Sequence, residues 1–139
     1  MTTTVNDLMH TNVVKLDSTA SVLDAARHMR DASIGDVLVM DGGKLRGIVT
    51  DRDLVVRCLA TQGDPSETKV GDVCSEDLVT LSPEDDFQDA VQLMNDHAVR
   101  RLPVVDGDEV VGILSLGDLS VAQDRESALG GISAAPPNQ

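Results

Sequence analysis

Aromatic residues are almost absent from this chain of 139 residues. The sequence contains one Phe and neither Trp nor Tyr, although 41% of its residues are hydrophobic. A chain of this length buries roughly two-thirds of its unfolded surface, so it needs no disulfide or metal to hold a core together. We therefore expect a core built from Val, Leu, Ile, Ala and Met.

Cysteines and basic residues are also few. Cys58 and Cys74 are too few for a disulfide scaffold, and they form no Cys-x-x-Cys motif. Both have apolar neighbours in the sequence, which favours buried free thiols over the alternative of a bridge between them. The sequence has 11 basic and 24 acidic residues, which gives a formal charge of −13. This charge repels nucleic-acid phosphates and anionic membranes.

Long apolar runs and familiar catalytic motifs are missing as well. No stretch of eighteen apolar residues occurs, and residues 1–4 resemble no part of a signal peptide, so we predict a cytoplasmic protein without a membrane partner. His10, His28 and His97 lack the spacing of metal ligands, and no Gly-rich phosphate loop is present. Cys58 has no histidine close in sequence. We expect no catalytic activity, no metal and no resident cofactor.

What the sequence does contain is an internal repeat. After a shift of 65 residues, residues 5–56 align with residues 70–121 without a gap, and sixteen of the aligned pairs are identical. Asp53 with Asp118 and Gly47 with Gly112 are among them. A register kept over this length indicates a duplicated structural unit.

Each copy shows the same order of elements, β-α-β-β-α. Apolar residues at helical spacing predict a helix from Val22 in the first copy and, in the second, a helix that begins at residues 82–85 with a Ser cap and a Pro. Glycines after Asp41 and Asp106 predict hairpin turns. The predicted strands cover residues 13–16, 36–40 and 45–50, then 78–81, 101–105 and 110–115, and further helices begin near residues 51 and 116.

The pattern divides the chain into four parts. The first copy covers residues 1–60, a linker covers 61–69, and the second copy covers 70–122. The tail, 123–139, is rich in Ser, Ala, Gly and Pro, and we expect it to be disordered. One copy has too few apolar residues to cover both faces of its sheet. We therefore expect an α/β (α+β) fold in which two copies pack about a pseudo-two-fold axis.

The end of the third strand carries the resemblance to a known family. Residues 47–53 and 112–118 both read Gly-aliphatic-aliphatic-Thr/Ser-x-x-Asp, and residues 99–106 look like the second strand of the same family. Over residues 5–122 the chain resembles the cystathionine-β-synthase (CBS) domain family, in particular its stand-alone tandem pairs. The resemblance implies a non-catalytic regulatory module that binds AMP, ADP, ATP or S-adenosylmethionine in clefts between the copies. It also implies a homodimer and an effector protein that receives the signal in trans.

Physical chemistry gives these residues a role at such a ligand. A carboxylate accepts two hydrogen bonds from a ribose diol, for which Asp53 and Asp118 are the candidates. Thr50 and Ser115 stand where a helix begins, which favours an anion. Apolar strand residues are expected to hold the base. The full set of expected contacts is Val14, Ile34, Gly35, Val37, Thr50, Arg52 and Asp53 in the first copy, and Val79, Val99, Arg100, Arg101, Leu102, Pro103, Ser115 and Asp118 in the second.

A simpler alternative stays open for the same motif. Thr/Ser-x-x-Asp is also the pattern of a helix capping box, which needs no ligand, and it occurs seven times in the sequence. The two copies differ as well, since the first has Asp36 where the second has Arg101. Arg100 and Arg101 can equally be solvated strand-edge charges. A ligand-free structural or stress-response dimer is therefore the competing hypothesis.

Overall fold

The structure, a computed structural model, describes residues 3–76 and 78–131. The chain folds into two compact units whose boundaries differ from those of the sequence repeats. Asn12–Leu78 forms one, called here the first-repeat unit, and Met1–Thr11 with Val79–Gln139 forms the other, the second-repeat unit. Each unit is described by itself.

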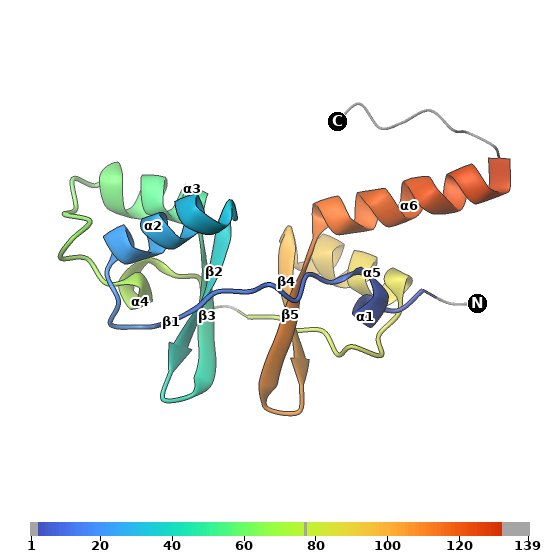
Figure 1. Cartoon of the computed structure of the whole chain (residues 1–139), viewed down its shortest axis with the longest axis horizontal. Helices are drawn as coiled ribbons and strands as arrows, with labels where there is room; N and C mark the ends of the chain where they lie inside the picture. The colour runs from blue at the N-terminus through green and yellow to red at the C-terminus, as the bar shows by residue number, and fades with distance from the viewer. Residues whose placement is uncertain (1–2, 77, 132–139) are drawn as a thin grey trace. The chain divides into compact units, whose positions relative to one another are not determined.

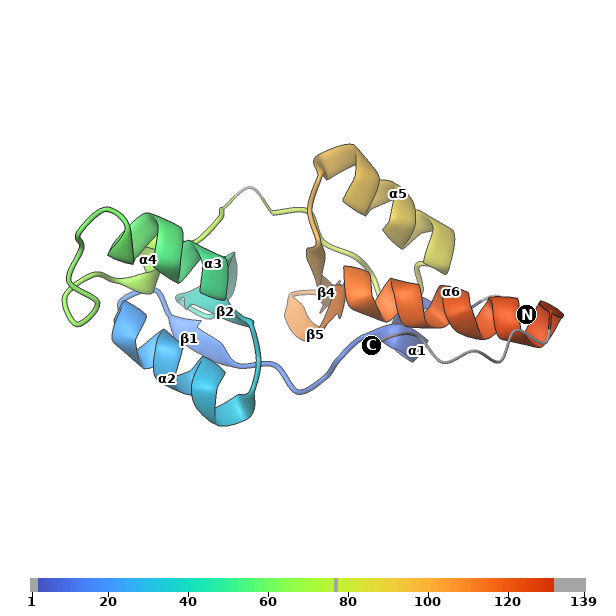
Figure 2. The same ribbon diagram turned by 90° about the horizontal axis from the view of Figure 1, so that it is seen from above.

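The first-repeat unit is a three-stranded sheet with helices packed against it (Figure 1). The short strand β1 runs parallel to β2, and β2 pairs with β3 in an antiparallel hairpin. Figure 2 shows that α2 lies beside the helical segment formed by α3 and η1. The elements are β1 (Lys15–Asp17), α2 (Val22–Ala32), β2 (Asp36–Asp41), β3 (Lys44–Thr50), α3 (Asp51–Asp53), the π-helix η1 (Leu54–Leu59) and α4 (Val70–Val73).

The second-repeat unit has the same plan with a smaller sheet (Figure 1). Its hairpin matches that of the other unit residue for residue, while the counterpart of β1 is reduced to one parallel bridge between Leu81 and Val104. The elements are α1 (Val5–Leu8), α5 (Phe87–His97), β4 (Arg101–Asp106), β5 (Glu109–Ser115) and α6 (Leu116–Gly131). The β-α-β-β-α order and the mixed α+β class expected from the sequence are confirmed.

The cores contain the aliphatic residues that the composition required. Val22, Ala25 and Met29 on one face of α2 pack with strand residues of the first-repeat unit. The same periodicity places Ala90 and Met94 of α5 in the core of the second-repeat unit. Apolar side chains spaced by three and four residues lie on one side of a helix, which is why a sequence pattern locates a core face.

The two repeats exchange their first helices. Helix α1 belongs to the first repeat in sequence, yet Val5 is fully buried in the core of the second-repeat unit. Helix α4 opens the second repeat, yet Val70 is fully buried in the core of the first-repeat unit. The exchange explains why the compact units are offset from the sequence repeats.

The structure differs from the sequence prediction at the start of the second helix. We predicted that it begins at residues 82–85, but α5 starts at Phe87 with Asp86 as its N-cap, accepting a hydrogen bond from Asp89 N at 2.9 Å. The carbonyl groups of Pro83 and Asp85 instead accept hydrogen bonds from the first amides of α1, at 3.0 and 2.8 Å. The Ser-Pro segment is a turn because the exchanged helix uses its backbone.

Two further segments are more ordered than the sequence suggested. Helix α6 continues to Gly131, so residues 123–131, assigned above to a disordered tail, are helical, and residues 132–139 lie outside the described part of the chain. The linker 61–69 is a series of turns held to α2, since the Val22 amide donates to the Thr68 carbonyl and the Leu23 amide to the Pro65 carbonyl. Backbone hydrogen bonds give this segment a fixed path that its polar composition does not reveal.

Candidate functional site

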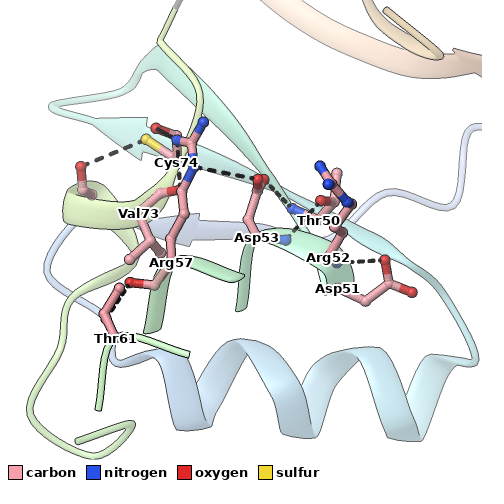
Figure 3. Close-up of polar contacts among 9 residues, drawn as sticks. Thr50, Asp51, Arg52, Asp53, Arg57, Thr61, Val73 and Cys74 are labelled. Carbon is pink, nitrogen blue, oxygen red and sulfur yellow. Dashed lines mark hydrogen bonds and ion pairs between the residues drawn. The ribbon is translucent and has the colours of Figure 1, made fainter. Parts of the chain in front are cut away.

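The first candidate corner lies where β3 passes into α3 (Figure 3). Thr50 N donates to Asp53 Oδ2 at 2.9 Å, and Asp53 N donates to Thr50 Oγ1 at 3.1 Å. The two residues therefore form a capping box, the ligand-free alternative considered for this motif. The box satisfies two backbone amides but uses only one oxygen of the carboxylate.

Arginine side chains near this corner serve mainly to anchor α4. Arg57 Nη1 donates to the carbonyl oxygen of Val73 at 3.3 Å, while its Nε lies 3.7 Å from Asp53 Oδ1 (Figure 3). Arg46 donates through Nε to Glu76 Oε1 at 3.1 Å. Both arginines are therefore engaged within the unit, whereas Arg52 is an exposed residue at the start of the helix.

Acidic residues dominate the rest of the first corner. Asp36 is the cross-strand partner of Thr50 in the β2–β3 hairpin. Asp51 opens α3 and its amide donates to the Gly35 carbonyl at 3.0 Å, which ties the helix start to the end of the preceding loop. Asp36, Asp51 and Asp53 thus lie at this corner together with Arg52 and Arg57, so its local charge attracts a phosphate group less than a pair of arginines would.

The second candidate corner repeats this geometry between β5 and α6. Ser115 N and Ser115 Oγ both donate to Asp118 Oδ2, at 2.8 and 2.9 Å, and Asp118 N donates to Ser115 Oγ at 3.1 Å. The Leu116 amide donates to the Arg100 carbonyl at 2.8 Å, as its counterpart does in the first corner. The duplicated sequence therefore folds into two corners with the same backbone bonds.

A surface hollow of about 480 Å³ opens at the second corner. It is lined by Arg100, Arg101, Ser115, Leu116, Gly117 and Ser120. Arg101 is the cross-strand partner of Ser115, in the position that Asp36 occupies in the first corner. The structure thus gathers three of the residues expected at a ligand, two of them arginines, around one helix start.

The second corner also contains a residue that the sequence analysis assigned no role. His10 Nε2 lies 2.7 Å from Asp118 Oδ1, and the side chains are 65% and 12% exposed. No sequence signal relates these residues, because they are more than a hundred positions apart. The contact exists because the segment that carries α1 crosses to β5, where His10 and Ile113 form an isolated antiparallel bridge.

Comparison with known proteins decides the family. The family model of the CBS domain matches residues 5–59 and again residues 70–124. The chain belongs to the CBS-domain family. Its two repeats form a CBS pair, which is a regulatory module, and they account for nearly all of the described chain.

Several relatives are similar along most of their length. The CBS domain-containing protein YhcV of Bacillus subtilis (strain 168) is 42% identical over 125 residues, covering 89% of each chain. Hypoxic response protein 1 of Mycobacterium tuberculosis (strain ATCC 25618 / H37Rv) is 30% identical over 119 residues, covering 85% of this chain and 83% of the relative.

Solved structures show the same CBS pair. A crystal structure of hypoxic response protein I with two coordinated zinc ions matches with a TM-score of 0.76 and 29% identity, covering 86% of this chain and 98% of the other. The CBS domain pair of protein MJ0100, in complex with 5′-methylthioadenosine and S-adenosyl-L-methionine, shares the fold with a TM-score of 0.81 and 23% identity. The match to MJ0100 covers 91% of this chain and 99% of that one.

The residues expected to hold a base differ in how much of their side-chain surface is accessible. Val37, Leu102 and Pro103 are fully buried. They have no exposed surface to offer a ligand. Val14 and Ile34 are partly buried against the core of the first-repeat unit, and Val79 and Val99 against that of the second-repeat unit. These four keep an accessible edge.

Two glycines of the CBS motif, Gly47 and Gly112, lie against the backbone of neighbouring segments. A Cβ atom on Gly47 would lie 2.5 Å from the carbonyl oxygen of Ser75, and one on Gly112 would lie 2.7 Å from that of His10. Only a residue without a side chain fits these positions. The approaching backbone belongs to the exchanged segments that follow α4 and α1.

The remaining candidates for chemistry in the part of the chain that is described are two buried cysteines. Cys58 and Cys74 are buried free thiols, and burial raises the pKa of Cys74, with a further increase from Glu76. Residues 3–76 and 78–131 contain no group of three His, Cys, Asp or Glu side chains arranged to hold a metal. Within the same ranges, no helix has the length and apolarity needed to cross a membrane.

Proposed function

We propose that this CBS pair binds an adenosyl nucleotide at its strand-to-helix corners and signals occupancy to a partner protein in trans. The candidate ligands are AMP, ADP, ATP and S-adenosylmethionine. The observation that carries the proposal is the hollow at the second corner, which combines a helix start, the Ser115 hydroxyl and two arginines. The guanidinium groups of Arg100 and Arg101 provide donors of the kind that a phosphate group requires, beside the positive end of α6.

Charge favours the second corner for a phosphorylated ligand. Arg100 and Arg101 line its hollow, whereas the first corner has Asp36 opposite Thr50 and two further aspartates in α3. The molecule carries a formal charge of −13, so a local pair of arginines is needed to attract an anion. The first corner suits an adenosyl ligand that presents no phosphate.

The CBS pair of MJ0100 supports the choice of ligand class, since it was solved with 5′-methylthioadenosine and S-adenosyl-L-methionine. Both molecules share an adenosine moiety, whose ribose diol matches the carboxylate of Asp53 or Asp118 in hydrogen-bonding capacity.

A second candidate function is a structural dimer that binds no nucleotide. The observation in its favour is that Asp53 and Asp118 already complete capping boxes. Thr4 with Asp7 forms the same kind of box at the start of α1, where no ligand is expected. Under this alternative both aspartates stabilise helices and have no other role.

Calorimetric titration with AMP and with adenosine separates the two candidates. Arg101→Asp, which copies the residue of the first repeat, should weaken AMP binding by about tenfold, equivalent to about 1.4 kcal/mol, and leave adenosine binding unchanged. Arg27→Asp reverses the charge of an exposed arginine on α2 and serves as the matched control. Absence of heat from any adenosyl ligand at millimolar concentration would favour the ligand-free dimer.

The proposal also covers self-association and the transmission of the signal to another protein. We propose a homodimer that uses the apolar side chains exposed on η1, namely Val55, Val56 and Leu59. Because CBS pairs are regulatory modules, the signal of an occupied site is delivered to a separate effector protein. The cytoplasmic location, the absence of catalysis and the absence of nucleic-acid binding stay predictions from the sequence.

A further inference from the structure

The two candidate aspartates differ in how much of their carboxylate is free to accept hydrogen bonds. An ionised carboxylate offers about four lone-pair sites on its two oxygens. At Asp118, Oδ2 accepts two hydrogen bonds from Ser115, at 2.8 and 2.9 Å, and Oδ1 lies 2.7 Å from His10 Nε2. Three of these sites are therefore in use, which leaves room for one ligand hydroxyl.

Asp53 is much less engaged. Its Oδ2 accepts one hydrogen bond, from Thr50 N at 2.9 Å, and its Oδ1 lies 3.7 Å from Arg57 Nε, which is beyond hydrogen-bonding distance. A ribose diol donates two hydrogen bonds, so Asp53 can accept both without losing a partner. Asp118 can accept both only if His10 withdraws.

His10 is well placed to give way. Its backbone is fixed to β5 by two hydrogen bonds with Ile113, from His10 N at 2.9 Å and to His10 O at 3.0 Å. Its side chain is 65% exposed and contacts Asp118 at the surface of the unit. The imidazole is the exposed partner of this contact, so a ligand can displace it while the backbone stays in place.

The other repeat shows how the corner looks without this histidine. Ser75 stands 65 residues after His10 and forms the same isolated bridge, with Ile48 in place of Ile113. The Ser75 side chain has no hydrogen bond or ion pair with Asp53, whose contacts in the described chain are with Thr50 and Arg57. The duplicated fold thus tolerates a short side chain at this position.

We propose that His10 is a specificity-determining residue that competes with the ribose diol for Asp118 Oδ1 and so weakens nucleotide binding at the second corner. The inference rests on the proposed function, since it concerns the same ligand. The two corners then differ in two respects. At the second corner arginines attract the phosphate, but His10 occupies the carboxylate oxygen that would accept from the ribose diol. At the first corner the carboxylate of Asp53 is available to the diol, but other acidic residues lie nearby.

The test isolates the second corner by disabling the first. In an Asp53→Ala background, we compare AMP binding by calorimetry with and without His10→Ser, which installs the residue that the other repeat carries. The additional change should lower the Kd for AMP about two- to fivefold, the range that a polar contact with one exposed partner allows. His28→Ala in the same background removes an exposed imidazole on α2 and should leave the Kd unchanged.

Two further variants complete the design. Asp118→Ala added to the Asp53→Ala/His10→Ser protein should remove the gain, because the freed acceptor is lost. His10→Ala in place of His10→Ser gives an independent measurement with the same expected result, and a thermal melt of each variant verifies folding. Equal Kd values with and without His10 would overturn the inference. If the Kd values are equal but the wild-type chain binds AMP, the proposed function stands and only the role of His10 is wrong. If neither the wild type nor any variant binds AMP, the proposed function and the role of His10 are both wrong.

Discussion

His10 and Ile113 form a reciprocal pair of backbone hydrogen bonds, with His10 N donating to the Ile113 carbonyl at 2.9 Å and Ile113 N to the His10 carbonyl at 3.0 Å. The equivalent pair in the other unit joins Ser75 to Ile48, at 2.9 and 3.2 Å. Each repeat thus places its first segment on the third strand of the other repeat. The exchange makes the two halves of the chain depend on each other for folding.

The exchange predicts that a mutation in α1 destabilises the second-repeat unit. Val5 is fully buried in that core, and Val5→Ala removes two methyl groups, which should lower the free energy of unfolding by about 2 kcal/mol. Hydrogen exchange should quicken in α5, β4 and β5. Val70→Ala is the matched variant and should quicken exchange in β2 and β3 instead. The same pattern of exchange in both variants would contradict the exchange of helices.

The close approach at Gly47 predicts a large cost for a single methyl group. Gly47→Ala places a Cβ atom 2.5 Å from the Ser75 carbonyl oxygen and 2.8 Å from Cys74 Sγ. The backbone must shift, and we expect a loss of about 1–3 kcal/mol in a denaturant titration. Gly117→Ala is the control, because its Cβ would meet only Ser115 Oγ at 3.6 Å. Equal stability of the two variants would show that the exchanged segment can move aside.

The capping box at the first corner predicts separable effects on stability and binding. Asp53→Ala should lower the free energy of unfolding by about 1 kcal/mol, because the Thr50 amide loses its acceptor. Asp53→Asn keeps one oxygen as an acceptor and should cost less. Both variants should show less adenosine-induced thermal stabilisation than the wild type, since neither keeps the carboxylate at the first corner. Stabilisation equal to that of the wild type in both would leave the cap as the whole role of Asp53.

Cys74 predicts a dependence of stability on alkaline pH. Burial, and then the charge of Glu76, raise the pKa of this thiol above its ordinary value of 9.0, so the unfolded chain loses the thiol proton at lower pH than the folded one. The contribution of Cys74 is complete below pH 9.0 and is lost as the pH rises through the raised pKa. The difference in the free energy of unfolding between the wild type and Cys74→Ala, measured by denaturant titration, should therefore be smaller at high pH. A constant difference would argue against this assignment.

The exposed face of η1 predicts the mode of self-association. Val55 and Leu59 are 54% and 55% exposed, which is unusual for large aliphatic side chains that lie close together on one helix. If this face forms the dimer, the Leu59→Asp variant should sediment as a monomer at micromolar concentration, where the wild type sediments as a dimer. The substitution should not change the midpoint of thermal unfolding of the monomer. A wild-type chain that stays monomeric at high concentration would refute the proposed dimer.

Local sequence signals located most of the fold and the backbone of both corners. The helical spacing of Val22, Ala25 and Met29 identified α2, and the paired glycines identified the hairpins, with Gly42 and Gly107 at positive φ of 61° and 65°. The same signals failed at residues 82–85, where a Ser-Pro start was read as a helix cap. A turn and a helix start have similar sequences, and the amides of α1 decide between them by bonding to Pro83 and Asp85.

The sequence by itself determined that two copies of one β-α-β-β-α unit exist and where each Thr/Ser-x-x-Asp motif lies, because turns, caps and helical periodicity act over a few residues. Only the tertiary structure decided which compact unit contains each first helix, and which side chain contacts Asp118. Those outcomes depend on contacts between residues such as His10 and Asp118, which are distant along the chain and share no local pattern. The contact of His10 with Asp118 is therefore a product of packing and not of the motif.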